Sequence, residues 1–99
     1  MVVKMNSKEN EILNILQEEC AEVIQAVSKC NRFGIDENKP KNPKTNRQHL
    51  EEELGDVLAM IHLLVESGVV NKTNLEYAKQ AKFEKLKHWS NIDISLLNK

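Results

Sequence analysis

The stretch from Ser7 to Asn31 contains no proline or glycine, and this unbroken run restricts the fold more than any other feature of the sequence. Its apolar residues recur at steps of three and four, in the series Ile12, Leu16, Cys20, Val23, Val27 and Cys30. An α-helix turns once in about 3.6 residues, so this spacing places them on one helical face. Asn6 followed by Glu9 has the form of a capping box. We predict a long amphipathic helix from about Asn6 or Ser7 to Asn31.

Two further helices and a short C-terminal element follow from the same pattern. A second helix is expected from Thr45 or Asn46 to near Gly68, with the apolar stripe Leu50, Leu54, Val57, Ile61 and Leu64. Gly68 suits the left-handed conformation that often ends a helix. Thr73 with Glu76 resembles a capping box and is expected to open a third helix that runs to Trp89 or Ser90. The tail, residues 91–99, is apolar enough for a short fourth element.

Both prolines lie in the connection between the first two helices, residues 32–46, which shows no periodicity. A connection of this length is uncommon in a small domain and is often functional, although a tolerated surface loop is an equal alternative.

Composition narrows the class of protein. A chain of 99 residues with 4% aromatic residues and three glycines predicts one all-α domain over residues 1–99. The net charge of −1 gives no support for nucleic-acid binding through bulk charge. No apolar run has the length of a membrane span, and the N-terminus lacks a signal-peptide core. Cys20 and Cys30 are too far apart along one helix to pair, so they are expected to be buried thiols of a cytoplasmic protein.

The helices carry more apolar surface than so short a chain covers by itself. We therefore expect self-association, in which two or more chains complete a helical bundle.

Four acidic residues occupy unexpected places on the helical wheels. Glu19 falls inside the apolar arc of the first helix and Glu22 lies at its edge. Glu53 and Asp56 lie among the apolar residues of the second helix. Each pair has i,i+3 spacing, which places both carboxylates on one face. Glu18, Glu51 and Glu52 lie further round and are expected to be solvated.

A carboxylate among apolar neighbours must become protonated, form a pair or bind a cation. In one interpretation the four residues merely rim a groove and contact water or lysine. In the other, their oxygens converge on a hard cation, Mg²⁺ or its substitute Mn²⁺. A carboxylate-bridged di-iron site is disfavoured because no Glu-x-x-His motif precedes His49, His62 or His88, and zinc is disfavoured because no Cys/His cluster has ligand spacing.

The strings EECAEVIQAV, EEELGDVLAMIHLL and KFEKLKHW resemble the MazG-like branch of the all-α nucleoside triphosphate pyrophosphohydrolases, over about residues 10–90. Glu18-Glu19-x-x-Glu22 and Glu53-x-x-Asp56 match the EExxE…ExxD signature of that family. The resemblance implies cleavage of a nucleoside triphosphate between the α and β phosphates by a homodimer or homotetramer. It also implies that Glu19, Glu22, Glu53 and Asp56 bind the metal, and that Glu18 and Glu19 are catalytic.

Basic residues of the third helix are the expected phosphate contacts. Lys82 matches the lysine of the family's Lys-Phe pair, and Lys79 and Lys85 lie three residues to either side. Ordinary lysines that lie along an apolar helix are the alternative. His49 lies about 40° from Glu53 on the helical wheel, and it is expected either to cap the helix start or to contact phosphate.

A different class of function also fits an acidic groove between helices. The alternative is a non-catalytic helical module that binds another protein through this groove. Neither a nucleic acid nor a membrane is expected as a partner.

Overall fold

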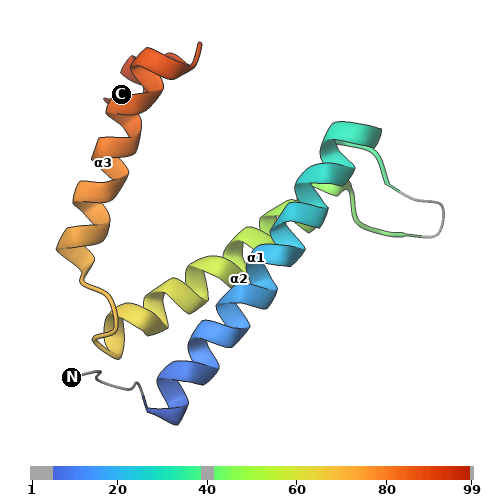
Figure 1. Ribbon diagram of the computed structural model, residues 1–99. Helices are drawn as coiled ribbons and strands as arrows, with labels where there is room; N and C mark the ends of the chain where they lie inside the picture. Colours follow the sequence, from blue (N-terminus) through green and yellow to red (C-terminus); the bar gives the residue numbers. More distant parts are fainter. Residues whose placement is uncertain (1–5, 39–41, 99) are drawn as a thin grey trace. The chain divides into compact units, whose positions relative to one another are not determined.

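The computed structural model describes residues 6–38 and 42–98, and all the regular structure in these two ranges is helical. The order is α1 (Ser7–Phe33), α2 (Asn46–Glu66), α3 (Lys72–Trp89) and a 3₁₀ helix, η1 (Ile94–Asn98) (Figure 1). The predicted all-α class, with three long helices and a short C-terminal element, is confirmed.

Helix α1 begins with the predicted capping box. The Oδ1 atom of Asn6 accepts from the Glu9 amide at 2.9 Å, and the Asn6 amide donates to Oε2 of Glu9 at 3.0 Å. The helix extends two residues past the predicted end, to Phe33. It stops at Gly34, whose φ of +99° lies in a region that side chains other than glycine disfavour.

Helix α2 begins within the predicted limits, because Thr45 caps it through a reciprocal pair of bonds with Gln48. Its end also agrees with the prediction. The last helical residue is Glu66, and Gly68 follows with a φ of +80°.

The start of α3 differs from the prediction. Asn71 is the N-cap residue, and its Oδ1 accepts from the Asn74 amide at 3.0 Å. Thr73 lies inside the first turn, so the expected capping box of Thr73 with Glu76 is wrong. The physical reason is that two good capping residues stand two positions apart, and asparagine caps a helix at least as well as threonine does.

The chain divides into two compact units, Met1–Val69 and Val70–Lys99. In the first unit, α1 and α2 pack side by side as an antiparallel hairpin (Figure 1). In the second unit, η1 packs against α3.

Polar contacts fasten the connection between α1 and α2 to the start of α2. The guanidinium of Arg47 forms two bonds with the carboxylate of Asp36, at 2.9 and 3.3 Å. The amides of Asn46 and Arg47 donate to the carbonyls of Glu37 and Ile35, at 2.8 and 2.7 Å. These bonds fix the end of the hairpin at which α2 begins.

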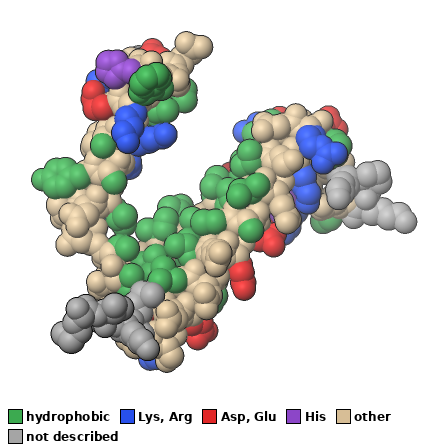
Figure 2. Space-filling view, viewed as in Figure 1, with side chains coloured by type: hydrophobic (Ala, Val, Ile, Leu, Met, Phe, Trp, Pro, Cys, Tyr) green, Lys and Arg blue, Asp and Glu red, His purple; other side chains and the backbone are tan. Residues whose placement is uncertain are grey.

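Little of the apolar surface of the described residues is covered. Ala26 and Leu64 are the buried hydrophobic residues, whereas Ile24 is 69% exposed and Leu58 is 66% exposed. Figure 2 shows hydrophobic side chains spread along the α1–α2 hairpin. Cys20 is exposed and Cys30 is half-buried, so the expectation of two buried thiols is wrong within a single chain; both thiols are free.

No helix in the described ranges combines the length and the apolar character needed to cross a membrane.

Candidate active site

Three carboxylates meet between α1 and α2. Glu19 on α1 and Glu53 and Asp56 on α2 each offer an oxygen, and these oxygens all lie within 4.8 Å of one another. The i,i+3 spacing turns Glu53 and Asp56 to one side of α2, and the pairing of the two helices brings that side to Glu19. We call these three residues the acidic cluster.

The members of the acidic cluster differ in their exposure. Glu19 is half-buried, and the side chain of Glu53 is only 15% exposed. Asp56 is exposed, although the sequence placed it among apolar residues. One reason is that Leu63, which flanks Asp56 on the helical wheel, is itself 44% exposed in the single chain.

Desolvation and the neighbouring carboxylates both act on Glu19. Desolvation raises the pKa of its carboxyl above the ordinary value, and the negative charges of Asp56 and Glu53 raise it further. A hydrogen bond with Asp56 adds to the shift, because Glu19 donates in that bond only when it is protonated. Glu19 is therefore partly removed from water and close to two other carboxylates.

The other two predicted acidic residues lie outside this group. Glu22 is exposed and is not one of the three converging carboxylates, although its charge contributes to the raised pKa of Glu19. Glu18 is also exposed and is not part of the acidic cluster. The structure thus brings together three of the four predicted metal ligands.

The donor set fits a hard divalent cation. Carboxylate oxygens are the ligands that Mg²⁺ and Mn²⁺ prefer, and a site with few protein ligands leaves positions for water and phosphate oxygens. Within the described residues, neither Glu19 nor Asp56 has a lysine or arginine nitrogen within 4.0 Å. The described residues therefore give no support to the interpretation in which a lysine neutralises these carboxylates.

The three predicted phosphate contacts lie on α3, in the unit Val70–Lys99, whereas the acidic cluster lies in the unit Met1–Val69. Lys79, Lys82 and Lys85 are all exposed. Lys79 pairs with Glu76 at 2.9 Å on the same helix. Their contact with phosphate stays a prediction.

Sequence reasoning missed two lysines, Lys29 and Lys44, that lie beside the acidic cluster. A pocket of about 380 Å³ is lined by Lys29, Lys44, His49 and Glu53, so one wall of it belongs to the acidic cluster. His49 Nε2 lies 3.2 Å from Glu53 Oε1, and Thr45 rather than His49 caps α2. One signal was available for Lys29, since Glu19, Glu22, Ala26 and Lys29 follow one another at steps of three and four along one face of α1.

Comparison with known proteins agrees with this arrangement. The family described as the MazG nucleotide pyrophosphohydrolase domain matches residues 7–91, which include the acidic cluster and all of α3. No match was found among curated proteins or among solved structures. The family match covers most of the chain, and the chain therefore belongs to the MazG nucleotide pyrophosphohydrolase domain family.

Proposed function

We propose that the protein is a nucleoside triphosphate pyrophosphohydrolase that depends on Mg²⁺, with Mn²⁺ as a substitute. The substrate is a ribo- or deoxyribonucleoside triphosphate, and the products are the nucleoside monophosphate and pyrophosphate. The observation that supports this most is the acidic cluster, in which three carboxylates from two helices converge without a lysine or arginine partner among the described residues. Membership of the MazG family supports the reaction class.

The reaction joins a water oxygen to the α-phosphorus. The bond from that phosphorus to the oxygen bridging the β-phosphorus breaks, and this oxygen leaves with pyrophosphate. A divalent cation held by Glu19, Glu53 and Asp56, with Glu22 as the fourth proposed ligand, would neutralise phosphate charge and make the α-phosphorus more electrophilic. The proton of the attacking water requires a base, and the two candidates are Glu18 and Glu19.

Glu18 and Glu19 offer different advantages for that proton transfer. Glu18 is exposed and is not a member of the acidic cluster, so its carboxylate is not engaged there. Glu19 lies within the cluster itself, which places its carboxylate beside the cation and the water that the cation would bind. Lys79, Lys82 and Lys85 remain the proposed contacts of α3 with phosphate.

The broader setting is also part of the proposal. We propose that residues 1–99 act as one MazG-like domain, that two or four copies associate, and that the enzyme works in the cytoplasm. The exposed apolar residues of the hairpin support association, and the two free thiols fit a reducing compartment.

The test is a screen of the eight common nucleoside triphosphates with Mg²⁺, in which chromatography separates the products. We expect at least one substrate to yield its monophosphate and pyrophosphate. Glu53→Gln should lower this turnover by about 100-fold or more, because it removes a negative oxygen from the cation site.

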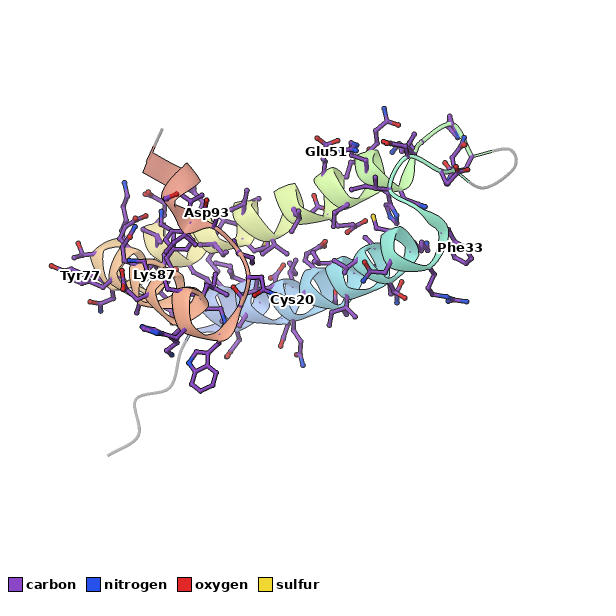
Figure 3. The ribbon with its side chains drawn as sticks, turned by 90° about the horizontal axis from the view of Figure 1, so that it is seen from above. Cys20, Phe33, Glu51, Tyr77, Lys87 and Asp93 are labelled. Atoms are coloured by element: carbon purple, nitrogen blue, oxygen red, sulfur yellow. The ribbon has the colours of Figure 1, made fainter. Side chains whose placement is uncertain are left out.

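Glu51→Gln is the matched control. Glu51 is on the same helix and is exposed on the side of α2 away from α1 (Figure 3), so its neutral variant should keep wild-type turnover. The proposal is wrong if the wild type turns over none of the eight nucleotides, or if Glu53→Gln is as active as Glu51→Gln.

A non-catalytic protein-binding module is the alternative outcome. Such a module would gain no thermal stability from Mg²⁺ with nucleotide, whereas ligands that bind the native state raise the unfolding temperature. If Mg²⁺ with nucleotide raises the unfolding temperature but no turnover is seen, the protein binds nucleotide without hydrolysing it.

A further inference from the structure

The pocket beside the acidic cluster is built from three parts of the unit Met1–Val69. Lys29 comes from the last turns of α1, Asn42 to Thr45 from the connection, and Asn46, His49, Glu52 and Glu53 from the first turns of α2. Its volume of about 380 Å³ falls within the range of roughly 300–1,000 Å³ that is usual for small-molecule sites. Glu53 belongs both to the pocket and to the acidic cluster, so the pocket lies directly beside the cluster.

The pocket lining favours an anion once the acidic cluster holds a cation. Its two lysines, Lys29 and Lys44, are balanced by Glu52 and Glu53, and a divalent cation bound at Glu53 would leave the pocket positive. His49, Asn42, Thr45 and Asn46 add polar side chains. No aromatic residue lines this pocket, so it lacks the surface on which a nucleobase would stack. A chain of phosphate groups matches these donors better than a base does.

Side chains, and not the helix terminus, must bind such an anion. The amide of Asn46 donates to the Glu37 carbonyl, and the amide of Arg47 donates to the Ile35 carbonyl. The next amide, of Gln48, donates to Oγ1 of Thr45. Since the first three amides of α2 already have acceptors, the helix start offers no free donor to phosphate.

Lys29 is the principal candidate for the contact. It is half-buried, and among the described residues it has no carboxylate within 4.0 Å. Lys44 already pairs with Glu52 at 2.6 Å, in a bridge whose side chains are about half exposed. A solvated pair of this kind contributes little stability, so Lys44 can exchange its partner for phosphate at small cost.

We propose that this pocket is a polyphosphate subsite, in which Lys29 and Lys44 hold the β- and γ-phosphates that leave as pyrophosphate. The inference rests on the proposed function, because it places the α-phosphate at the acidic cluster. It adds a second set of phosphate contacts, carried by the α1–α2 unit itself, to those proposed for α3. It also gives a role to the segment Asn42 to Thr45, which carries Lys44 at the pocket.

The test measures binding of pyrophosphate in the presence of Mg²⁺ by isothermal titration calorimetry, which needs no turnover. Lys29→Met keeps the apolar stem and removes the charge, and Lys8→Met on the exposed start of α1 is the matched control. We expect Lys29→Met to weaken pyrophosphate binding by about tenfold or more, as the loss of a charge-assisted hydrogen bond would. Lys29→Arg should restore most of the binding, and Lys8→Met should leave it unchanged.

Binding of the nucleoside monophosphate with Mg²⁺ separates the two halves of the substrate. Monophosphate binding should be unchanged in Lys29→Met. If Lys29→Met fails to fold, Lys44→Met takes its place and should show the same selective loss of pyrophosphate binding. Unchanged pyrophosphate binding in both variants would overturn the inference. So would a loss confined to the monophosphate, which would assign the pocket to the nucleoside. Absence of turnover in the wild type is a separate result, which would overturn the proposed function.

Discussion

At the scale of single residues, Glu19 is the member of the acidic cluster whose pKa is raised. Its carboxyl is partly desolvated and faces Asp56 and Glu53, which raises its pKa. A negative charge in that position opposes folding when no cation is present, because like charges at short range repel. The same arrangement favours folding once a cation neutralises it.

Glu19→Gln should therefore have opposite effects with and without metal. The variant should unfold at a higher temperature than the wild type in a chelator, since one of the mutually repelling charges is gone. It should also lose most of the rise in unfolding temperature that Mg²⁺ gives the wild type. Thermal unfolding followed by circular dichroism measures both effects, with Glu11→Gln, exposed on the same helix, as the control that behaves like the wild type. An undiminished response of Glu19→Gln to Mg²⁺ would contradict the assignment of Glu19 to the cation site.

The pKa of Asp36 is shifted in the opposite direction to that of Glu19. The hydrogen bonds and positive charge of Arg47 hold the pKa of its carboxyl below the ordinary value of 3.8. A lowered pKa in the folded state stabilises the fold above the unfolded pKa, and this contribution disappears as the pH falls through the folded value.

Asp36→Asn should thus be less stable than the wild type at neutral pH, by a small amount because the pair is exposed. The difference should be constant above about pH 5 and shrink steadily below about pH 4. Urea unfolding of both proteins across this range measures it. A difference that persists unchanged at about pH 2 would show that the ion pair is not its cause.

At the scale of the helices, sequence patterns predicted almost everything that depends on neighbours within one segment. The capping box of α1, the start of α2 and the glycine after α2 are where the patterns placed them, because caps and left-handed turns are set by residues three to five positions apart. The start of α3 was misassigned because Asn71 and Thr73 both qualify as caps, and their sequence spacing alone does not separate them.

The two candidate caps of α3 provide a direct test. Asn71→Ala should destabilise the first turn by about 1 kcal/mol, because it removes the acceptor of the Asn74 amide. Thr73→Ala should change stability much less, since Thr73 is a helical residue with no capping bond. Hydrogen exchange at the Asn74 amide reports the local effect. Equal protection of that amide in Asn71→Ala and the wild type would contradict the capping role.

At the scale of the whole molecule, the site could be predicted only in part. The helical wheels placed Glu19, Glu53 and Asp56 among the apolar residues of their helices, and the antiparallel hairpin brings the three carboxylates together. The pocket with Lys29 and Lys44 could not be predicted, because a wheel gives the faces of one helix and not the path of the connection that closes the pocket. The exposure of Asp56 and Cys20 was missed for a related reason, since the pattern predicts apolar faces without showing what covers them.

The exposed hairpin surface predicts association of chains. Light scattering coupled to gel filtration should give a mass at least twice the 11.4 kDa of one chain. A double variant, Ile24→Lys with Leu58→Lys, should shift the population toward the monomer, because both side chains are largely exposed in the single chain and would be covered on association. Asn14→Lys, on the exposed surface of α1, is the control for added charge. A wild type that elutes with the mass of a monomer would contradict this prediction.

The acidic cluster is proposed to direct water to the α-phosphorus. Hydrolysis of a substrate nucleotide in H₂¹⁸O with Mg²⁺, followed by mass spectrometry of both products, shows which phosphorus the water attacks. We expect one ¹⁸O atom in the nucleoside monophosphate and none in pyrophosphate, with the label lost along with turnover in Glu53→Gln. Label in pyrophosphate, or release of a nucleoside diphosphate with labelled phosphate, would place the attack at another phosphorus and show that the proposal is wrong.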